Sequence, residues 1–85
     1  MYTVEYSKSS QKTLRRLPRN VADKLLDKME EIAKSPYAQH RNLKPLTGTP
    51  YYRLRVGDWR VIYEIQDERL IILVLKIASR GEVYK

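Results

Sequence analysis

The feature that most restricts the fold is an unbroken apolar run, LIILVL, at residues 70–75. A run this short cannot cross a bilayer as a helix, but it can form a strand of a sheet. Side chains alternate between the two faces of a strand, so a run that is apolar at every position needs cover on both faces. We therefore expect residues 70–77 to form a central strand, and the rest of the chain must supply its neighbours.

Two segments before this run also have strand character, and each ends at a turn signal. Residues 51–56 end at Gly57-Asp58, and residues 59–66 end at Asp67-Glu68. Glycine and aspartate favour tight turns because they tolerate the backbone conformations that turns require. The C-terminal half therefore predicts two successive hairpins, which make three antiparallel strands.

The N-terminal half predicts one strand and two helices. Apolar and polar residues alternate over residues 2–6, as in a half-buried strand, and the serines that follow are suited to capping a helix over residues 8–16. Pro18 interrupts that helix, and a second begins with Asn20 as its expected cap and ends at Ser35-Pro36. The apolar residues of the second helix recur at intervals of three or four: Val21, Leu25, Met29 and Ile32.

The remaining stretch, residues 37–50, lacks periodicity and contains two prolines and a glycine, so we expect a surface connection. The predicted fold class is α+β, with an N-terminal strand, a two-helix hairpin and then an antiparallel sheet. At 85 residues, the chain has room for one hydrophobic core, and residues 1–85 are expected to form a single domain.

Composition narrows the classes of function. The absence of cysteine removes disulfides, thiolate nucleophiles and cysteine-based zinc sites. The N-terminus carries no charged segment followed by an apolar one, so we expect a cytoplasmic protein without membrane contact. A net charge of +7 is large for so short a chain and favours polyanionic partners.

Several catalytic devices have no support in the sequence. The single histidine, His40, lies in the expected connection without an evident nucleophile beside it. The carboxylates are scattered over helix and turn positions, so we expect no metal site. Only Gly48, Gly57 and Gly81 are available, too few for a phosphate-binding glycine loop, and no cofactor is implied.

Basic residues, in contrast, converge in the predicted sheet. Arg53 and Arg55 point to the same side of one strand because side chains alternate with period two. The turn after this strand folds Arg60 back beside them, and the last strand delivers Arg80 at its end. We expect four guanidinium groups to lie together on one face, where they would repel one another unless an anion binds.

At these residues the chain resembles the RelE/ParE superfamily of bacterial toxins, and the resemblance runs nearly end to end. The segments that carry it are LKPLTG at 43–48, YRLRVGDWRVIY at 52–63 and IASRGEVY at 77–84. RelE-like members are ribosome-dependent endoribonucleases that cut mRNA and are silenced by an antitoxin. The resemblance therefore implies a RelE-like fold, ribosome and mRNA as partners, and a hetero-oligomeric complex with a cognate antitoxin. It assigns Arg55, Arg60, Arg80 and Tyr84 to catalysis and Lys44 and Arg53 to RNA binding.

RNA can be cleaved without a metal when the adjacent 2′-hydroxyl acts as the nucleophile. The reaction needs removal of the hydroxyl proton, stabilisation of extra negative charge on the phosphate and a proton for the leaving 5′-oxygen. Arginines suit the second task, since they stay charged, but they are poor proton carriers. Tyr84 is the candidate base, because neighbouring cations should lower its pKa, and Lys44 and Glu82 are the alternatives.

Two other functions fit the same composition. A ParE-like toxin would poison DNA gyrase by binding it, without RNA chemistry, although that branch generally lacks the converging arginines and tyrosine. A catalytically inactive module would use the basic face only to bind RNA or an antitoxin, with an affinity that depends steeply on salt.

Overall fold

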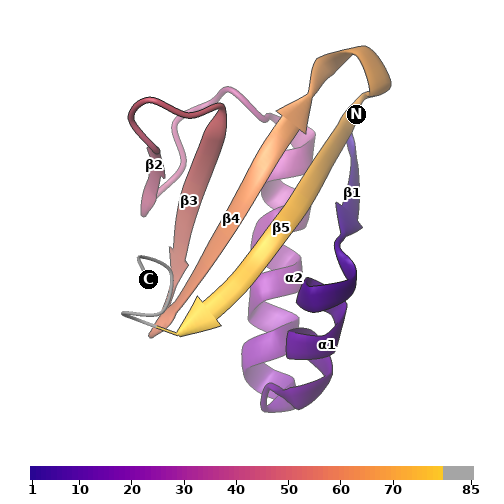
Figure 1. Ribbon diagram of the computed structural model, residues 1–85, viewed down its shortest axis with the longest axis vertical. Coiled ribbons are helices and arrows are strands. Elements are labelled where there is room, and N and C mark those ends of the chain that lie inside the picture. The colour runs from indigo at the N-terminus through magenta and orange to yellow at the C-terminus, as the bar shows by residue number, and fades with distance from the viewer. Residues whose placement is uncertain (80–85) are drawn as a thin grey trace.

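The computed structural model describes residues 1–79, which form a five-stranded sheet and two helices (Figure 1). The elements in chain order are β1 (Thr3–Tyr6), α1 (Lys8–Arg16), α2 (Arg19–Lys34), β2 (Leu43–Pro45), β3 (Tyr51–Val56), β4 (Trp59–Gln66), a 3₁₀ turn (Asp67–Arg69) and β5 (Ile71–Ser79). The predicted α+β class is confirmed. The candidate site residues of the C-terminal segment lie outside the described residues: Arg80, Glu82 and Tyr84.

The strand order is β1-β5-β4-β3-β2, with β1 parallel to β5 and every other pair antiparallel. The two predicted hairpins are present, and β3 and β4 have the expected bounds. Two expectations need correction. The middle strand is β4, while the apolar β5 lies one place from the edge, because β1 pairs with its other side. The connection over residues 37–50 contains a short strand, β2, which extends the sheet beyond β3.

The helices form where the sequence predicted them, but the cap of α2 differs. Pro18 occupies the N-cap position with φ of −52°, and its carbonyl accepts the amide protons of Val21 and Ala22 at 3.0 Å each. The helix therefore starts at Arg19, one residue before the expected cap, Asn20. Neither helix within residues 1–79 is long and apolar enough to cross a membrane.

Helix α1 is attached to β5 through serine hydroxyls at its start. The β4–β5 register shifts at Ile62/Tyr63, and the carbonyls of Val74 and Leu75 in this irregular part of β5 accept bonds from the serines. The Ser7 hydroxyl caps the helix by accepting the Ser10 amide at 3.1 Å, and it lies 2.9 Å from the Leu75 carbonyl oxygen. Ser10 is fully buried, and its hydroxyl lies 3.3 Å from the Val74 carbonyl oxygen.

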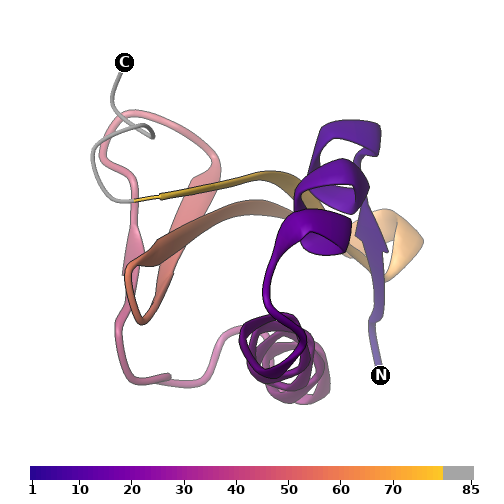
Figure 2. The same ribbon diagram turned by 90° about the horizontal axis from the view of Figure 1, so that it is seen from below.

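Helix α2 covers one face of the sheet (Figures 1 and 2). Its buried side chains pack with inward-facing residues of the strands in one core, made of Leu17, Leu25, Met29, Ile32, Ala33, Leu54, Val56, Val61, Tyr63, Ile72, Val74 and Ile77. Tyr52 stacks on Tyr63 at a ring separation of 5.5 Å. Since side chains alternate along a strand, burial of Leu54 and Val56 turns Arg53 and Arg55 to the opposite face.

A carboxylate with two tyrosines joins three distant segments at one end of the molecule. Asp67 accepts hydrogen bonds of 2.6 Å from both Tyr2 and Tyr37, which links the N-terminus, the segment after α2 and the β4–β5 connection. These two bonds hold the pKa of the Asp67 carboxyl below its usual value, and the bond from Tyr2 has the larger effect. The bond to Asp67 in turn raises the pKa of Tyr37 to about 12.

We predict that Ser7→Ala lowers the free energy of unfolding by about 1–2 kcal/mol, because it removes the helix cap and a partner of a β5 carbonyl together. Urea unfolding followed by circular dichroism measures the change. Ser9→Ala is the matched control, since Ser9 is exposed and its hydroxyl lies 3.4 Å from the same carbonyl oxygen. Equal losses in both variants would contradict the role given to the cap.

Candidate functional site

The β3–β4 hairpin places two arginines directly opposite each other. Val56 pairs with Trp59 around a two-residue turn, and the next pair along the ladder is Arg55 with Arg60. Gly57, the first turn residue, has φ of +60°, which is the position where a type II′ hairpin turn takes glycine. The turn thus fixes the register that joins the two arginines.

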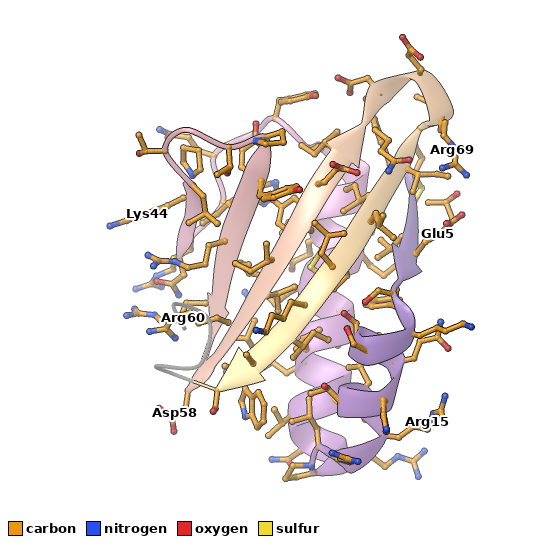
Figure 3. All side chains as sticks on the ribbon, viewed as in Figure 1. Glu5, Arg15, Lys44, Asp58, Arg60 and Arg69 are labelled. Atoms are coloured by element: carbon orange, nitrogen blue, oxygen red, sulfur yellow. The ribbon has the colours of Figure 1, made fainter. Side chains whose placement is uncertain are left out.

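Strand β2 adds a third side chain to this face. Lys44 is the direct partner of Arg53, two residues along β3 from Arg55. Figure 3 shows Lys44 and Arg60 projecting on the same side of the molecule, away from the helices. Residues of β2, β3 and β4 and the segment before β2 line one cavity of about 210 Å³: Asn42, Lys44, Arg53, Arg55 and Arg60.

Asn42 is the lining residue that the sequence analysis missed. It has φ of +63°, and its backbone carbonyl accepts the Arg55 amide at 3.0 Å. Its side-chain Oδ1 accepts a second bond from Nη2 of the same arginine at 3.1 Å. Asparagine tolerates positive φ better than most residues, and that tolerance is the only signal the sequence offered.

The lining is strongly cationic. No aspartate or glutamate of residues 1–79 lines the cavity. A neighbouring cavity of about 290 Å³ shares Asn42 and Arg55 and continues the basic lining over Lys24, Lys28 and Arg41. Arg60 donates to the Trp59 carbonyl at 3.4 Å, which orients its guanidinium along the hairpin. Clustered guanidinium groups suit an anion with several oxygens, because each planar group can donate two parallel bonds.

Other candidates lie away from this cavity. His40 contacts the Ser35 carbonyl with Nε2 at 2.7 Å and lines a larger cavity of about 580 Å³, which includes none of Arg53, Arg55 and Arg60. We take the smaller cavity as the site because it gathers the predicted cations. Burial raises the pKa of Tyr63 and raises that of Tyr6 to about 12, so neither tyrosine is suited to accept a proton.

Comparisons with known proteins show the family to which the chain belongs. Residues 4–84 match a family model described as the ParE toxin of type II toxin–antitoxin systems. The chain belongs to the ParE toxin family. The match reaches residue 84, so it includes the segment that carries Arg80 and Tyr84, which lies outside the described residues.

Individual members of the superfamily cover nearly the whole chain. The putative toxin RelE1 of Methanocaldococcus jannaschii is 31% identical, over 99% of this chain and 96% of its own. The mRNA interferase toxin RelE of Escherichia coli is 26% identical, over 98% of this chain and 90% of its own. The crystal structure of the RelE–RelB complex of Pyrococcus horikoshii has a TM-score of 0.82 and 30% identity, over 95% of this chain and 97% of the matched one. These matches confirm the predicted superfamily and fold.

For this ParE-family chain we predict that inorganic phosphate binds the arginine cavity and stabilises the folded state by mass action. The thermal midpoint should rise more in phosphate than in chloride of equal ionic strength. Arg55→Gln should reduce that excess, because it removes one forked donor from the cavity.

Arg69→Gln is the matched control for this measurement, since Arg69 is exposed in the β4–β5 connection and lies outside the cavity. Two results would contradict binding in the cavity: an extra rise of the thermal midpoint in phosphate that is unchanged in Arg55→Gln, or one that is reduced equally in the control. Either result would show that phosphate acts on the protein surface in general.

Proposed function

We propose that this chain is the toxin of a type II toxin–antitoxin pair and that it cuts mRNA on the ribosome without using a metal. The observation that supports this proposal most directly is one shared cavity on the face opposite α2. It is lined by Lys44, Arg53, Arg55 and Arg60. The name of the similar Escherichia coli protein, mRNA interferase toxin RelE, supports RNA as the substrate. The net charge of +7 supports a polyanion more generally.

The reaction we propose begins when the 2′-hydroxyl of one nucleotide attacks the adjacent phosphorus. The new bond joins O2′ to phosphorus and the bond from phosphorus to O5′ breaks, which leaves a 2′,3′-cyclic phosphate and a 5′-hydroxyl. One proton leaves the 2′-hydroxyl for a base, and another reaches the departing O5′. The protein must therefore supply an anion-stabilising group and two proton transfers.

The arginines supply the stabilisation in this scheme. Arg55 and Arg60 lie opposite each other, so their guanidinium groups can donate to different oxygens of the same phosphate as its charge grows. Arg80 is proposed as a third donor. Arginine keeps its charge throughout, so the proton acceptor must be another group, for which we propose Tyr84, with Lys44 and Glu82 as the alternatives.

Lys44 and Arg53 form a second cross-strand pair, which we assign to binding the RNA strand beside the reacting phosphate. Residues two apart on one face of a strand are separated by about 7 Å. The two pairs can therefore hold neighbouring parts of one RNA backbone, and the pair nearer the turn contacts the phosphate that is cut.

The partner follows from the same surface. Matched structures include toxin–antitoxin complexes, such as the RelE–RelB complex of Pyrococcus horikoshii. We propose that a cognate antitoxin binds this chain in a hetero-oligomeric complex and covers the arginine cavity with acidic residues. Such cover would exclude RNA from the cavity and so silence the toxin.

The test is primer extension on mRNA in a purified translation system, with and without ribosomes. Wild-type protein should produce cuts only with ribosomes, and Arg60→Gln should lower the cleavage rate by roughly 10²–10³-fold, as expected for losing one charge-stabilising donor. Arg80→Ala should lower it similarly, whereas Arg69→Gln should not.

Absence of cuts by folded wild-type protein would reject the proposed reaction. Inhibition of purified DNA gyrase by the same protein would then favour gyrase poisoning, the alternative that the ParE name of the family model suggests. Salt-sensitive RNA binding without either activity would indicate a catalytically inactive binding module.

Asn42 is proposed as a positioning residue that acts through Arg55. Asn42→Gly keeps the backbone, because glycine adopts φ of +63° without strain, and removes only the Oδ1 contact to the guanidinium. We predict a cleavage rate lowered roughly 3–10-fold, the size expected for one solvent-exposed hydrogen bond to the guanidinium, with little change in unfolding free energy. Cleavage rates and urea unfolding measure both quantities.

A double-mutant cycle separates this role from a general effect on the fold. If Asn42 acts only by orienting Arg55, then Asn42→Gly should cost nothing further in the Arg55→Gln background. Fully additive losses would show that Asn42 contributes independently of Arg55.

A further inference from the structure

Helix α1 carries a second basic surface that the arginine cavity does not include. Residues 7–22 contain five cations and no aspartate or glutamate. All five are exposed: Lys8, Lys12, Arg15, Arg16 and Arg19, which we call the α1 basic face.

Four of these cations lie on α1, and Arg19 is the first residue of α2. The inward side of α1 is defined by Ser10, which is fully buried, and by Leu14, which packs against the core. Lys8, Lys12 and Arg16 follow one another at intervals of four, so they project from the opposite side. With a rise of 1.5 Å per residue, this row is about 12 Å long.

The α1 basic face has no internal compensation. Within residues 1–79, none of its side chains takes part in a hydrogen bond or ion pair, whereas Lys28 on α2 lies 3.9 Å from Glu31. Like charges four residues apart on a helix repel and weaken it, and α1 has only nine residues. An external anion that binds along the row would relieve this repulsion.

The position of this face separates it from the proposed catalytic cavity. Figure 3 shows Arg15 and Arg60 projecting toward opposite sides of the molecule. Helix α1 packs beside β5, while the cavity lies over β2, β3 and the start of β4. A single polyanion that reaches both surfaces must therefore surround much of the protein.

Chemistry selects among the classes of polyanion. A helix that lies on a membrane inserts apolar side chains, but Leu14 and Leu17 of this segment pack into the protein core. Interfaces with proteins use apolar and aromatic anchors and contain little lysine, whereas the exposed side of α1 offers only cations, Ser9 and Gln11. Interfaces with nucleic acid are rich in positive charge, and phosphates recur every few ångströms along a duplex.

We propose that the α1 basic face is a second RNA-docking surface, which binds the phosphate backbone of a folded RNA without regard to sequence. The link between this surface and catalysis rests on the function proposed above. In that scheme, the RNA docked on the α1 basic face holds the protein while the arginine cavity acts on the substrate strand. The binding itself requires no cleavage.

The test is fluorescence anisotropy of a labelled RNA duplex of mixed sequence, titrated with the full chain at several KCl concentrations. The double variant Lys12→Gln/Arg16→Gln removes two charges from the α1 basic face. Its matched control, Lys34→Gln/Arg69→Gln, removes one lysine and one arginine from exposed positions outside α1. Thermal unfolding of each protein confirms that the variants fold.

The α1 variant should bind the duplex at least tenfold more weakly, and the slope of log affinity against log salt should become shallower by about 2, roughly one for each lost phosphate contact. The control should keep the wild-type slope. Equal effects in the two variants, or none in the α1 variant, would overturn the proposal.

Two further probes distinguish the other partners and the proposed function. Loss of binding to phosphatidylglycerol vesicles or to polyglutamate in the α1 variant, with duplex binding unchanged, would overturn the proposal in favour of a membrane or an acidic protein. A wild-type chain that shows the salt effect on duplex RNA but never cuts mRNA would leave this docking surface standing and reject the proposed reaction.

Discussion

The register of the β3–β4 hairpin is the constraint on which the candidate site depends. Shifting one strand by a single residue would turn every side chain to the other face, which would bury arginines and expose leucine and valine. Two features prevent this. Gly57 supplies the positive φ of a two-residue turn, and Leu54 and Val61 pair on the face that α2 covers. The hydrophobic core therefore determines where Arg55 and Arg60 meet.

The same division of faces explains how so small a chain tolerates concentrated charge. Apolar side chains of the strands gather toward α2, and the basic residues of β2, β3 and β4 gather on the opposite face, where water can solvate them. Like charges directly across a pair of strands are destabilising, so the pairs of Lys44 with Arg53 and of Arg55 with Arg60 each oppose the pairing of their strands. Such a cost is expected at the phosphate-binding site that we propose.

Much of this arrangement could be predicted from the sequence because it follows from periodicity and turn residues. The alternation in residues 51–56, the turn at Gly57-Asp58 and the apolar run of β5 predicted the hairpins and the convergence of three arginines. Strand β2 could not be predicted, since it has three residues, one of them Pro45, and exists through its pairing with β3. Asn42 was missed for a related reason: its role comes from its contact with Arg55 across the sheet edge.

The cap of α2 and the place of β5 in the sheet show a second limit of prediction from the sequence. Asn20 is a better capping residue than proline by type, but it lies inside the helix, whose first turn donates its hydrogen bonds to the Pro18 carbonyl. The apolar run of β5 showed that both its faces need cover, yet it could not show that one neighbour in the sheet is the parallel strand β1. Local patterns predict which segments are buried, and pairings between distant segments decide their order.

The claim that arginines assist attack by the RNA's own 2′-hydroxyl is tested most directly by the chemical ends of the cleaved RNA. We predict that mRNA cut by the wild-type protein on ribosomes carries a 2′,3′-cyclic phosphate on the upstream fragment and a 5′-hydroxyl on the downstream one, and that a single 2′-deoxy substitution at the cut site abolishes cleavage. A 5′-phosphate on the downstream fragment, or cleavage that survives the deoxy substitution, would contradict this chemistry, because either result requires attack by an external nucleophile such as water.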